Sequence, residues 1–170
     1  MFNRLISILL FVCFAIAAIA EPATVQTPSP VIHLEDMAGE PDGLGWCIDT
    51  RGRGLSDALH VHSCKPQGGD VQFRLTDTGQ INSVAFSDKC AELTGPPEPG
   101  QTVALLDCDT ANRLQSFLHN ADFLQPADDQ SLCLAAGPII NPAGPFSSRT
   151  LTLEPCNAVP SELVEWAVKE

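Results

Sequence analysis

The sequence predicts a single exported all-β domain, built from three copies of one unit and stapled by disulfides. Three observations support this prediction. A secretory leader occupies the amino terminus, six regularly spaced cysteines follow it, and the apolar stretches are short and separated by turn residues. The leader decides which residues belong to the mature chain.

Residues 1–20 have the layout of a secretory signal. Arg4 supplies a positive start, an apolar run follows it, and Ala18-Ile19-Ala20 forms a small-x-small cleavage pattern. The run is shorter than the roughly 20 residues that a membrane-spanning helix needs. Cys13 lies inside the run, which argues against a lipid-anchored cysteine. We therefore expect residues 1–20 to be removed and the product to be secreted, or periplasmic if the source is bacterial.

The chain that remains after cleavage is strongly acidic. It has 8 Lys and Arg against 21 Asp and Glu, a net charge of −13, compared with −12 for the full chain. Such a surface repels phosphate backbones and anionic lipid, so neither nucleic acid nor a membrane is an expected partner. A charge of this size also serves solubility alone.

Short strands, rather than helices, are predicted for the rest of the chain. Residues 21–30 are rich in Pro and Thr and are expected to be a flexible leader. The domain proper is expected at 31–170, where 14 prolines and 12 glycines across the chain interrupt helical patterns. Apolar stretches of about five residues recur there. They are VIHL at 31–34, LHVH at 59–62, TVALL at 102–106 and TLTL at 150–153.

Three markers recur in phase along this domain. The leading cysteines, Cys47, Cys90 and Cys133, are spaced 43 residues apart. The following cysteines come 17, 18 and 23 residues later, at Cys64, Cys108 and Cys156. An aromatic residue then arrives nine or ten residues on, at Phe73, Phe117 and Trp166. This periodicity predicts three units at about 31–78, 79–121 and 122–170.

The repeat also constrains the covalent structure and the fold. Six cysteines allow 15 pairings, and a threefold repeat favours pairing within each unit: 47–64, 90–108 and 133–156. Zinc is not indicated, because no two cysteines are two to four residues apart. Three β units of about 43 residues predict a β-trefoil with Phe73, Phe117 and Trp166 in its core.

From about Val31 to the carboxyl terminus the units resemble the ricin-type β-trefoil lectins. Members of that family repeat a Cys-Leu-Asp-like pattern, an apolar strand ending in Cys, and Gln-x-Trp. The corresponding segments of the first unit are Cys47-Ile48-Asp49, His60 to Cys64 and Val71-Gln72-Phe73. Those of the other units are Cys90-Ala91-Glu92 with Gln115-Ser116-Phe117, and Cys133-Leu134-Ala135 with Val164-Glu165-Trp166.

The resemblance implies a sugar site built from an acid, a stacking ring and nearby polar residues. In the first unit these positions hold Asp49, His62, His60 and Asp70, and the ligand would be a galactose-type or N-acetylated sugar. The second unit has Glu92 but Ala104 and Leu106 at the polar and stacking positions, and the third has Ala135, Thr152 and Glu154. We therefore expect at most one degenerate glycan site, in the first unit.

Plainer interpretations of the same residues stay open. Asp49 before Thr-Arg-Gly fits an ordinary turn. His60 and His62 point to one face of a strand, where they could be solvated or, with Asp49, hold a metal; no metal is our expectation. No Gly-x-Ser-x-Gly, His-Glu-x-x-His or phosphate-loop motif occurs, so we expect neither catalytic residues, a cofactor nor an enzyme. The alternative function is a trefoil that acts through protein contacts, as an inhibitor or interaction scaffold.

Overall fold

The computed structural model describes residues 22–52 and 54–170, and the predicted signal at 1–20 lies outside this part. The first unit contains β1 (Val31–Leu34), β2 (Trp46–Thr50), β3 (Leu59–Ser63) and β4 (Phe73–Leu75). The second contains β5 (Ile81–Ser83), β6 (Lys89–Leu93), β7 (Val103–Asp107), η1 (Arg113–Gln115) and β8 (Phe117–Asn120). The third contains β9 (Phe123–Pro126), β10 (Leu132–Ala136), β11 (Asn141–Ala143), β12 (Phe146–Arg149), β13 (Leu151–Pro155), η2 (Ser161–Leu163) and β14 (Trp166–Lys169). No helix within these residues is long and apolar enough to cross a membrane.

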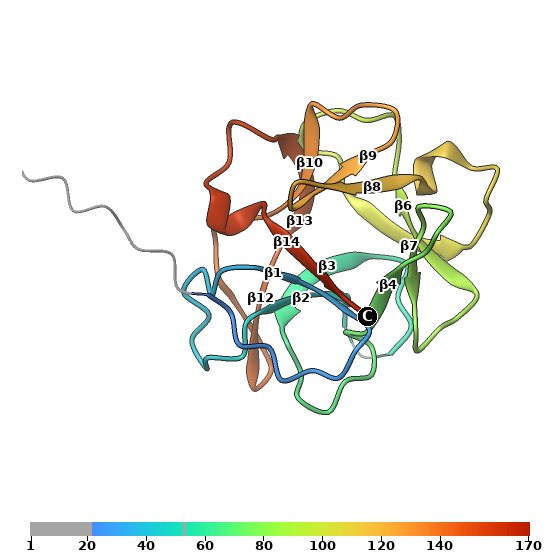
Figure 1. The fold of residues 1–170 in the computed structure, drawn as a ribbon. Helices are drawn as coiled ribbons and strands as arrows, with labels where there is room; N and C mark the ends of the chain where they lie inside the picture. Colours follow the sequence, from blue (N-terminus) through green and yellow to red (C-terminus); the bar gives the residue numbers. More distant parts are fainter. Residues whose placement is uncertain (1–21, 53) are drawn as a thin grey trace, which may run out of the picture.

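The strands form a β-trefoil, which confirms the predicted fold class. Each unit contributes one long hairpin, β2–β3, β6–β7 or β10–β13, and the units join through the pairs β4–β5 and β8–β9. Strand β14 returns to pair with β1 over Val31–Leu34, which closes the ring of units. Figure 1 shows the three lobes arranged around a common centre, running from blue through yellow to red.

Large aromatic side chains fill the centre where the three units meet. Phe73, Phe117 and Trp166 are at most 1% exposed and belong to one apolar cluster. Burying rings of this size is a major favourable term for a small β domain. Trp166 also donates its indole N–H to the Leu134 carbonyl at 2.8 Å, so its polar atom is satisfied. Trp46, which the repeat pattern does not single out, is buried in the same cluster.

The cysteines pair within units, as predicted. The bridges are Cys47–Cys64, Cys90–Cys108 and Cys133–Cys156. Each joins the first strand of a long hairpin to the residue that directly follows its second strand. In the chain-entropy description, closing a loop of this size stabilises the fold by roughly 3 kcal/mol.

The segment 22–30 differs from the flexible leader that we expected. Ala23 donates its N–H to the Glu35 carbonyl at 2.8 Å, and the Thr27 hydroxyl donates to the Lys65 carbonyl at 2.9 Å. Val25 packs beside the Cys47–Cys64 bridge. This Pro- and Thr-rich segment has no periodic apolar pattern of its own. It can still be ordered when a neighbouring surface offers hydrogen-bond partners and an apolar contact. Here the first unit offers both.

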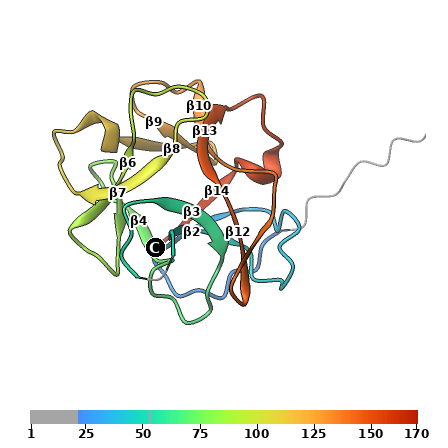
Figure 2. The same ribbon diagram turned by 180° about the vertical axis from the view of Figure 1, so that it is seen from behind.

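The third unit carries a hairpin that has no counterpart among the described residues of the other units. Strands β11 and β12 pair with each other, and β12 then pairs with β3 of the first unit. The six-stranded sheet that results runs β11-β12-β3-β2-β1-β14. In Figure 2, the view from behind, β12 reaches from the third lobe to lie beside β3.

Candidate functional site

The four residues that the sequence proposed for a sugar site lie together. Asp49 is on β2 and faces His60 across the β2–β3 hairpin, His62 lies two residues further along β3, and Asp70 is on the loop before β4. His60, His62 and Asp70 line a cavity of about 480 Å³. Asp49 is fully buried next to the two histidines, with its Oδ2 3.9 Å from His60 Nε2 and 3.7 Å from His62 Nδ1. It is therefore a strand residue, not the turn residue of the plainer interpretation.

The carboxylate of Asp49 is buried with little hydrogen bonding. Its Oδ2 forms an ion pair with Lys65 Nζ at 2.8 Å, whereas Oδ1 has no hydrogen-bond partner among the described residues. Burial opposes ionisation of this side chain, but the neighbouring His60 ring and Lys65 ammonium outweigh burial and hold the pKa of Asp49 below its ordinary value. Asp49 is thus an ionised acceptor whose Oδ2 is paired with Lys65 and whose Oδ1 keeps unused lone pairs, and a buried oxygen without a partner is costly unless something binds it.

Lys65 supplies a positive charge to this site, and the repeat pattern does not single it out. Its Nζ lies 2.8 Å from Asp49 Oδ2 and 2.6 Å from Asp70 Oδ1, so it bridges the two acids. Burial lowers the pKa of Lys65, but the two carboxylates raise it by more, and the net shift is upward. The signal that could have found it is the basic residue directly after Cys64, at the mouth of the predicted site.

The two histidines are packed rather than solvated. His62 is 6% exposed and donates from Nδ1 to the Ser63 carbonyl at 2.8 Å. Burial is the main reason that the pKa of His62 falls below 6.5, so the ring is neutral at pH 7. Within the described part of the chain no cluster of three or more His, Cys, Asp or Glu side chains could hold a metal. Lys65 already occupies the side of Asp49 that a cation would approach.

An aromatic ring from the third unit completes the cavity. Phe146, at the start of β12, lines it together with the turn Ala143-Gly144-Pro145. Its ring centre is 5.4 Å from that of His62, with the planes at 65°, an edge-to-face contact. Nothing in the first unit's own motifs points to this residue. The available signal is the longer spacing of the third cysteine pair, 23 residues against 17 and 18, which leaves room for an added hairpin.

The corresponding places in the other units are filled differently. Gln115 donates from Nε2 to Glu92 Oε2 at 2.8 Å, which satisfies that carboxylate from within the protein. Leu106 is 40% exposed and presents no ring. In the third unit Ala135 is buried, and Thr152 donates to Glu154 at 3.0 Å. Neither unit combines an available buried acid with an aromatic wall.

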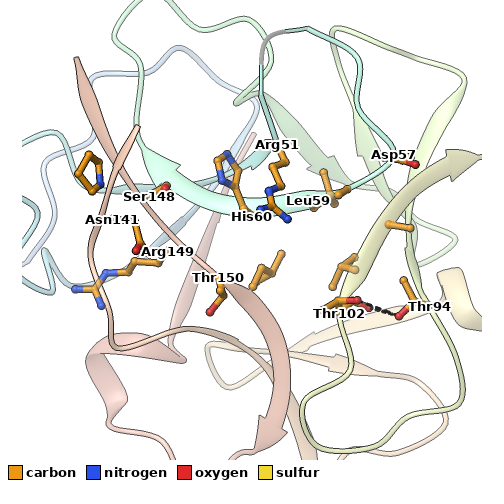
Figure 3. Close-up of a pocket in the computed structure, with 15 residues that line it drawn as sticks. Arg51, Asp57, Leu59, His60, Thr94, Thr102, Asn141, Ser148, Arg149 and Thr150 are labelled. Atoms are coloured by element: carbon orange, nitrogen blue, oxygen red, sulfur yellow. Dashed lines mark hydrogen bonds between the residues drawn. The ribbon is translucent and has the colours of Figure 1, made fainter. Parts of the chain in front are cut away.

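A second cavity adjoins the first and shares His60 with it. Its volume is about 560 Å³, and it lies where the three units meet, lined by Leu59, Val103 and Leu151 from one unit each. Figure 3 shows Arg51 beside His60 at the rim, while the Arg149 guanidinium points away from the other labelled side chains. Arg149 donates to the carbonyls of Gly137 at 2.7 Å and Ala38 at 2.5 Å, so its charge serves the fold.

Residues 39–160 match the ricin-type β-trefoil lectin domain family, and this span covers more than half of the chain. The chain belongs to the ricin-type β-trefoil lectin domain family. Membership agrees with the three-unit architecture, with the cysteine phase, and with the place of Asp49 two residues after Cys47.

Solved structures of other ricin-type and trefoil proteins share the fold at low sequence identity. An agglutinin from Abrus precatorius matches with a TM-score of 0.61 and 13% identity over 83% of this chain, which spans 46% of that protein. The β-trefoil lectin of the Vibrio vulnificus hemolysin/cytolysin, solved with N-acetyl-D-lactosamine bound, matches with a TM-score of 0.55 and 16% identity, over 82% of this chain and 91% of that one. GalNAc-T7, solved with UDP, GalNAc and Mn²⁺, matches with a TM-score of 0.55 and 16% identity, over 74% of this chain and 20% of that one. At such identities the likeness establishes the fold alone.

Proposed function

We propose that this ricin-type domain is an extracellular glycan-binding module with a single sugar site, in its first unit. Asp49 accepts hydrogen bonds from sugar hydroxyls, Lys65 and Asp70 complete the polar side of the site, and His62 borders the ring. The ligand is a galactose-type or N-acetylated sugar. The second and third units do not take part in sugar binding.

The observation that carries this proposal is the state of the Asp49 carboxylate. It is buried and ionised, its Oδ1 has no hydrogen-bond partner among the described residues while Oδ2 pairs with Lys65, and it lies directly behind the His60, His62 and Lys65 side chains that line a cavity. A carboxylate can accept about four hydrogen bonds. Adjacent sugar hydroxyls are donors of the right kind, and a charged acceptor strengthens each bond.

Family membership and the relatives' ligands also support a glycan. The Vibrio vulnificus lectin was solved with N-acetyl-D-lactosamine, which contains both a galactose and an N-acetylated sugar. Three disulfides suit an oxidising compartment, as does the predicted signal at 1–20, and both favour an extracellular place of action.

The test is a calorimetric titration of the oxidised domain with N-acetyl-D-lactosamine, galactose and N-acetylgalactosamine. One site without avidity predicts a dissociation constant of about 1 mM. Asp49→Ala should weaken binding by about ten- to a hundredfold, because a charged acceptor is worth roughly 1.5–3 kcal/mol. His62→Ala should weaken it less.

Glu92→Ala is the matched control, because it removes the equivalent acid from the second unit. It should leave the dissociation constant unchanged, and unfolding curves should establish that all variants are folded. Equal binding by wild type and Asp49→Ala would refute the site. Absence of binding to every glycan tested would refute the function.

A specific surface favours the alternative of protein contacts. Leu55 and Leu106 are 54% and 40% exposed and line one shallow cavity of about 570 Å³ beside the second unit. Exposed leucines in one place are a feature of protein interfaces. If no glycan binds, this surface becomes the leading candidate, and Leu106→Asp is the variant with which to test it.

A further inference from the structure

The hairpin β11–β12 is part of the third unit in sequence, but its strand β12 pairs with β3 of the first unit. Strand β12 pairs with β3 through Ser148 opposite His62 and Arg149 opposite Val61. His62 is one of the residues that line the proposed sugar site. The hairpin therefore adds a strand directly beside that site, from a segment about 85 residues further along the chain.

The base of this hairpin is held firmly. Ser147 donates its N–H to Ser63 Oγ at 3.1 Å, and that hydroxyl donates to the buried Glu40 carboxylate at 2.5 Å. Arg149 is 5% exposed, and its guanidinium carbon lies 4.7 Å from the centre of the Trp46 ring. The strand pairing, the Ser63 hydrogen bond and the cation–π contact together restrain β12. They therefore also restrain Phe146, which is its first residue.

Phe146 has the position and chemistry that the first unit's own sequence lacks. The stacking position of the family pattern holds His62, a small and polar ring. Phe146 lies against His62 edge to face, is partly exposed, and lines the same cavity as Lys65 and Asp70. The cavity thus has an aromatic wall and polar groups in one space, the combination that sugar recognition requires.

We propose that Phe146 is the surface on which the apolar face of the bound sugar packs, so that the binding site is composite, with its acid from the first unit and its ring from the third. This inference rests on the proposed function. The ligand must then carry hydroxyls along one edge and an unbroken row of C–H groups on one face. Galactose-type sugars meet both conditions.

The decisive comparison is between a ring and an equally apolar side chain without one. Phe146→Leu keeps apolar bulk against His62, whereas Phe146→Tyr keeps the ring. Titrated with N-acetyl-D-lactosamine, Phe146→Leu should raise the dissociation constant by roughly three- to tenfold, and Phe146→Tyr should stay within about twofold of wild type. Phe123→Leu, at another partly exposed phenylalanine remote from the cavity, is the matched control and should bind like wild type.

A second measurement separates stacking from a merely structural role of the hairpin. Ligand protons above an aromatic face move upfield in NMR spectra, so the C–H protons of the bound sugar should show this shift with wild type and Phe146→Tyr. The shift should be lost with Phe146→Leu at matched ligand saturation. This readout does not depend on how stable the Leu variant is, because the Tyr variant and the wild type carry the test by themselves.

The outcomes distinguish the two proposals. If Asp49→Ala weakens binding but Phe146→Leu binds like wild type, or if wild type causes no upfield shift, the composite site is refuted and the proposed function stands. If wild type binds no glycan, the proposed function is refuted and the role of Phe146 with it.

Discussion

The first and second units place an acid at the same point of the repeat, but the two carboxylates differ in their bonding partners. Asp49 is fully buried, its Oδ2 lies 2.8 Å from the Lys65 ammonium, and its Oδ1 has no hydrogen-bond partner among the described residues. Glu92 receives a hydrogen bond from Gln115, which also donates to the Asp107 carbonyl and accepts from the Asp109 N–H. A retained acid is therefore not by itself a retained site. In the second unit the acid is bonded to a side chain that also holds the neighbouring backbone, whereas in the first unit one oxygen of the acid has no partner among the described residues and lies behind the side chains that line a cavity.

The largest expected effect contrasts the disulfides of these two units. Cys47 and Cys64 are at most 1% exposed and contact the segment 22–30 through Val25, whereas Cys108 is exposed. The two disulfides close loops of nearly equal length, so removing either one should lower the free energy of unfolding by roughly 3 kcal/mol through chain entropy. Cys47→Ala/Cys64→Ala should lose more than that, because it also leaves a cavity beneath Val25.

Denaturant unfolding of the two double variants measures this difference. The first-unit pair should have the lower free energy of unfolding. Equal losses would mean that the packing of residues 22–30 contributes nothing to the stability of the first unit.

A smaller effect is expected from releasing the second unit's acid. Gln115→Ala leaves Glu92, the buried Gln80 amide and two backbone groups without their partner and should destabilise the domain by about 1–3 kcal/mol. It should not create a sugar site, because Leu106 offers no ring. Gln101→Ala is the control: among the residues that the structure describes, its amide bonds only to the exposed Thr94 hydroxyl, and the variant should change stability by less than about 0.5 kcal/mol. New glycan binding by Gln115→Ala would show that the acid alone defines a site.

The smallest effect is a pH dependence specific to the first unit. The pKa of Asp49 in the folded state is below its ordinary value of 3.8, so its ionised form stabilises the fold above that pH. This contribution is lost as the pH falls through the folded pKa. Wild type should therefore lose more stability than Asp49→Asn between about pH 5 and pH 2. Parallel curves of unfolding free energy against pH would contradict this assignment.

Residues in phase with the repeat could be predicted from the sequence, and residues outside it could not. Cysteines and core aromatics recur because each unit must close the same hairpin and bury the same ring, so spacing alone leads to the fold and the bridges. Lys65 and Phe146 each occur in one unit, and no periodic signal accompanies them. Phe146 reaches His62 only because β12 leaves its own unit, a contact between residues 84 positions apart that local patterns do not encode.

The segment 22–30 illustrates the same limit. Its composition is that of a linker, but it is held by hydrogen bonds to the backbone carbonyls of Glu35 and Lys65. No sequence pattern marks these two residues as its partners. Composition describes what a segment can bury by itself. It does not describe what a neighbouring surface can offer to it.

The pairing of β12 with β3 and of β14 with β1 has a consequence for the order of events during synthesis. The ribosome releases the first unit long before the strands that flank it on either side. Until residue 149 has emerged, the edge of β3 is unpaired and the cavity lacks Phe146. A nascent chain therefore carries an open sheet edge in its first-made part, and the proposed sugar site is complete only after Phe146 has been made.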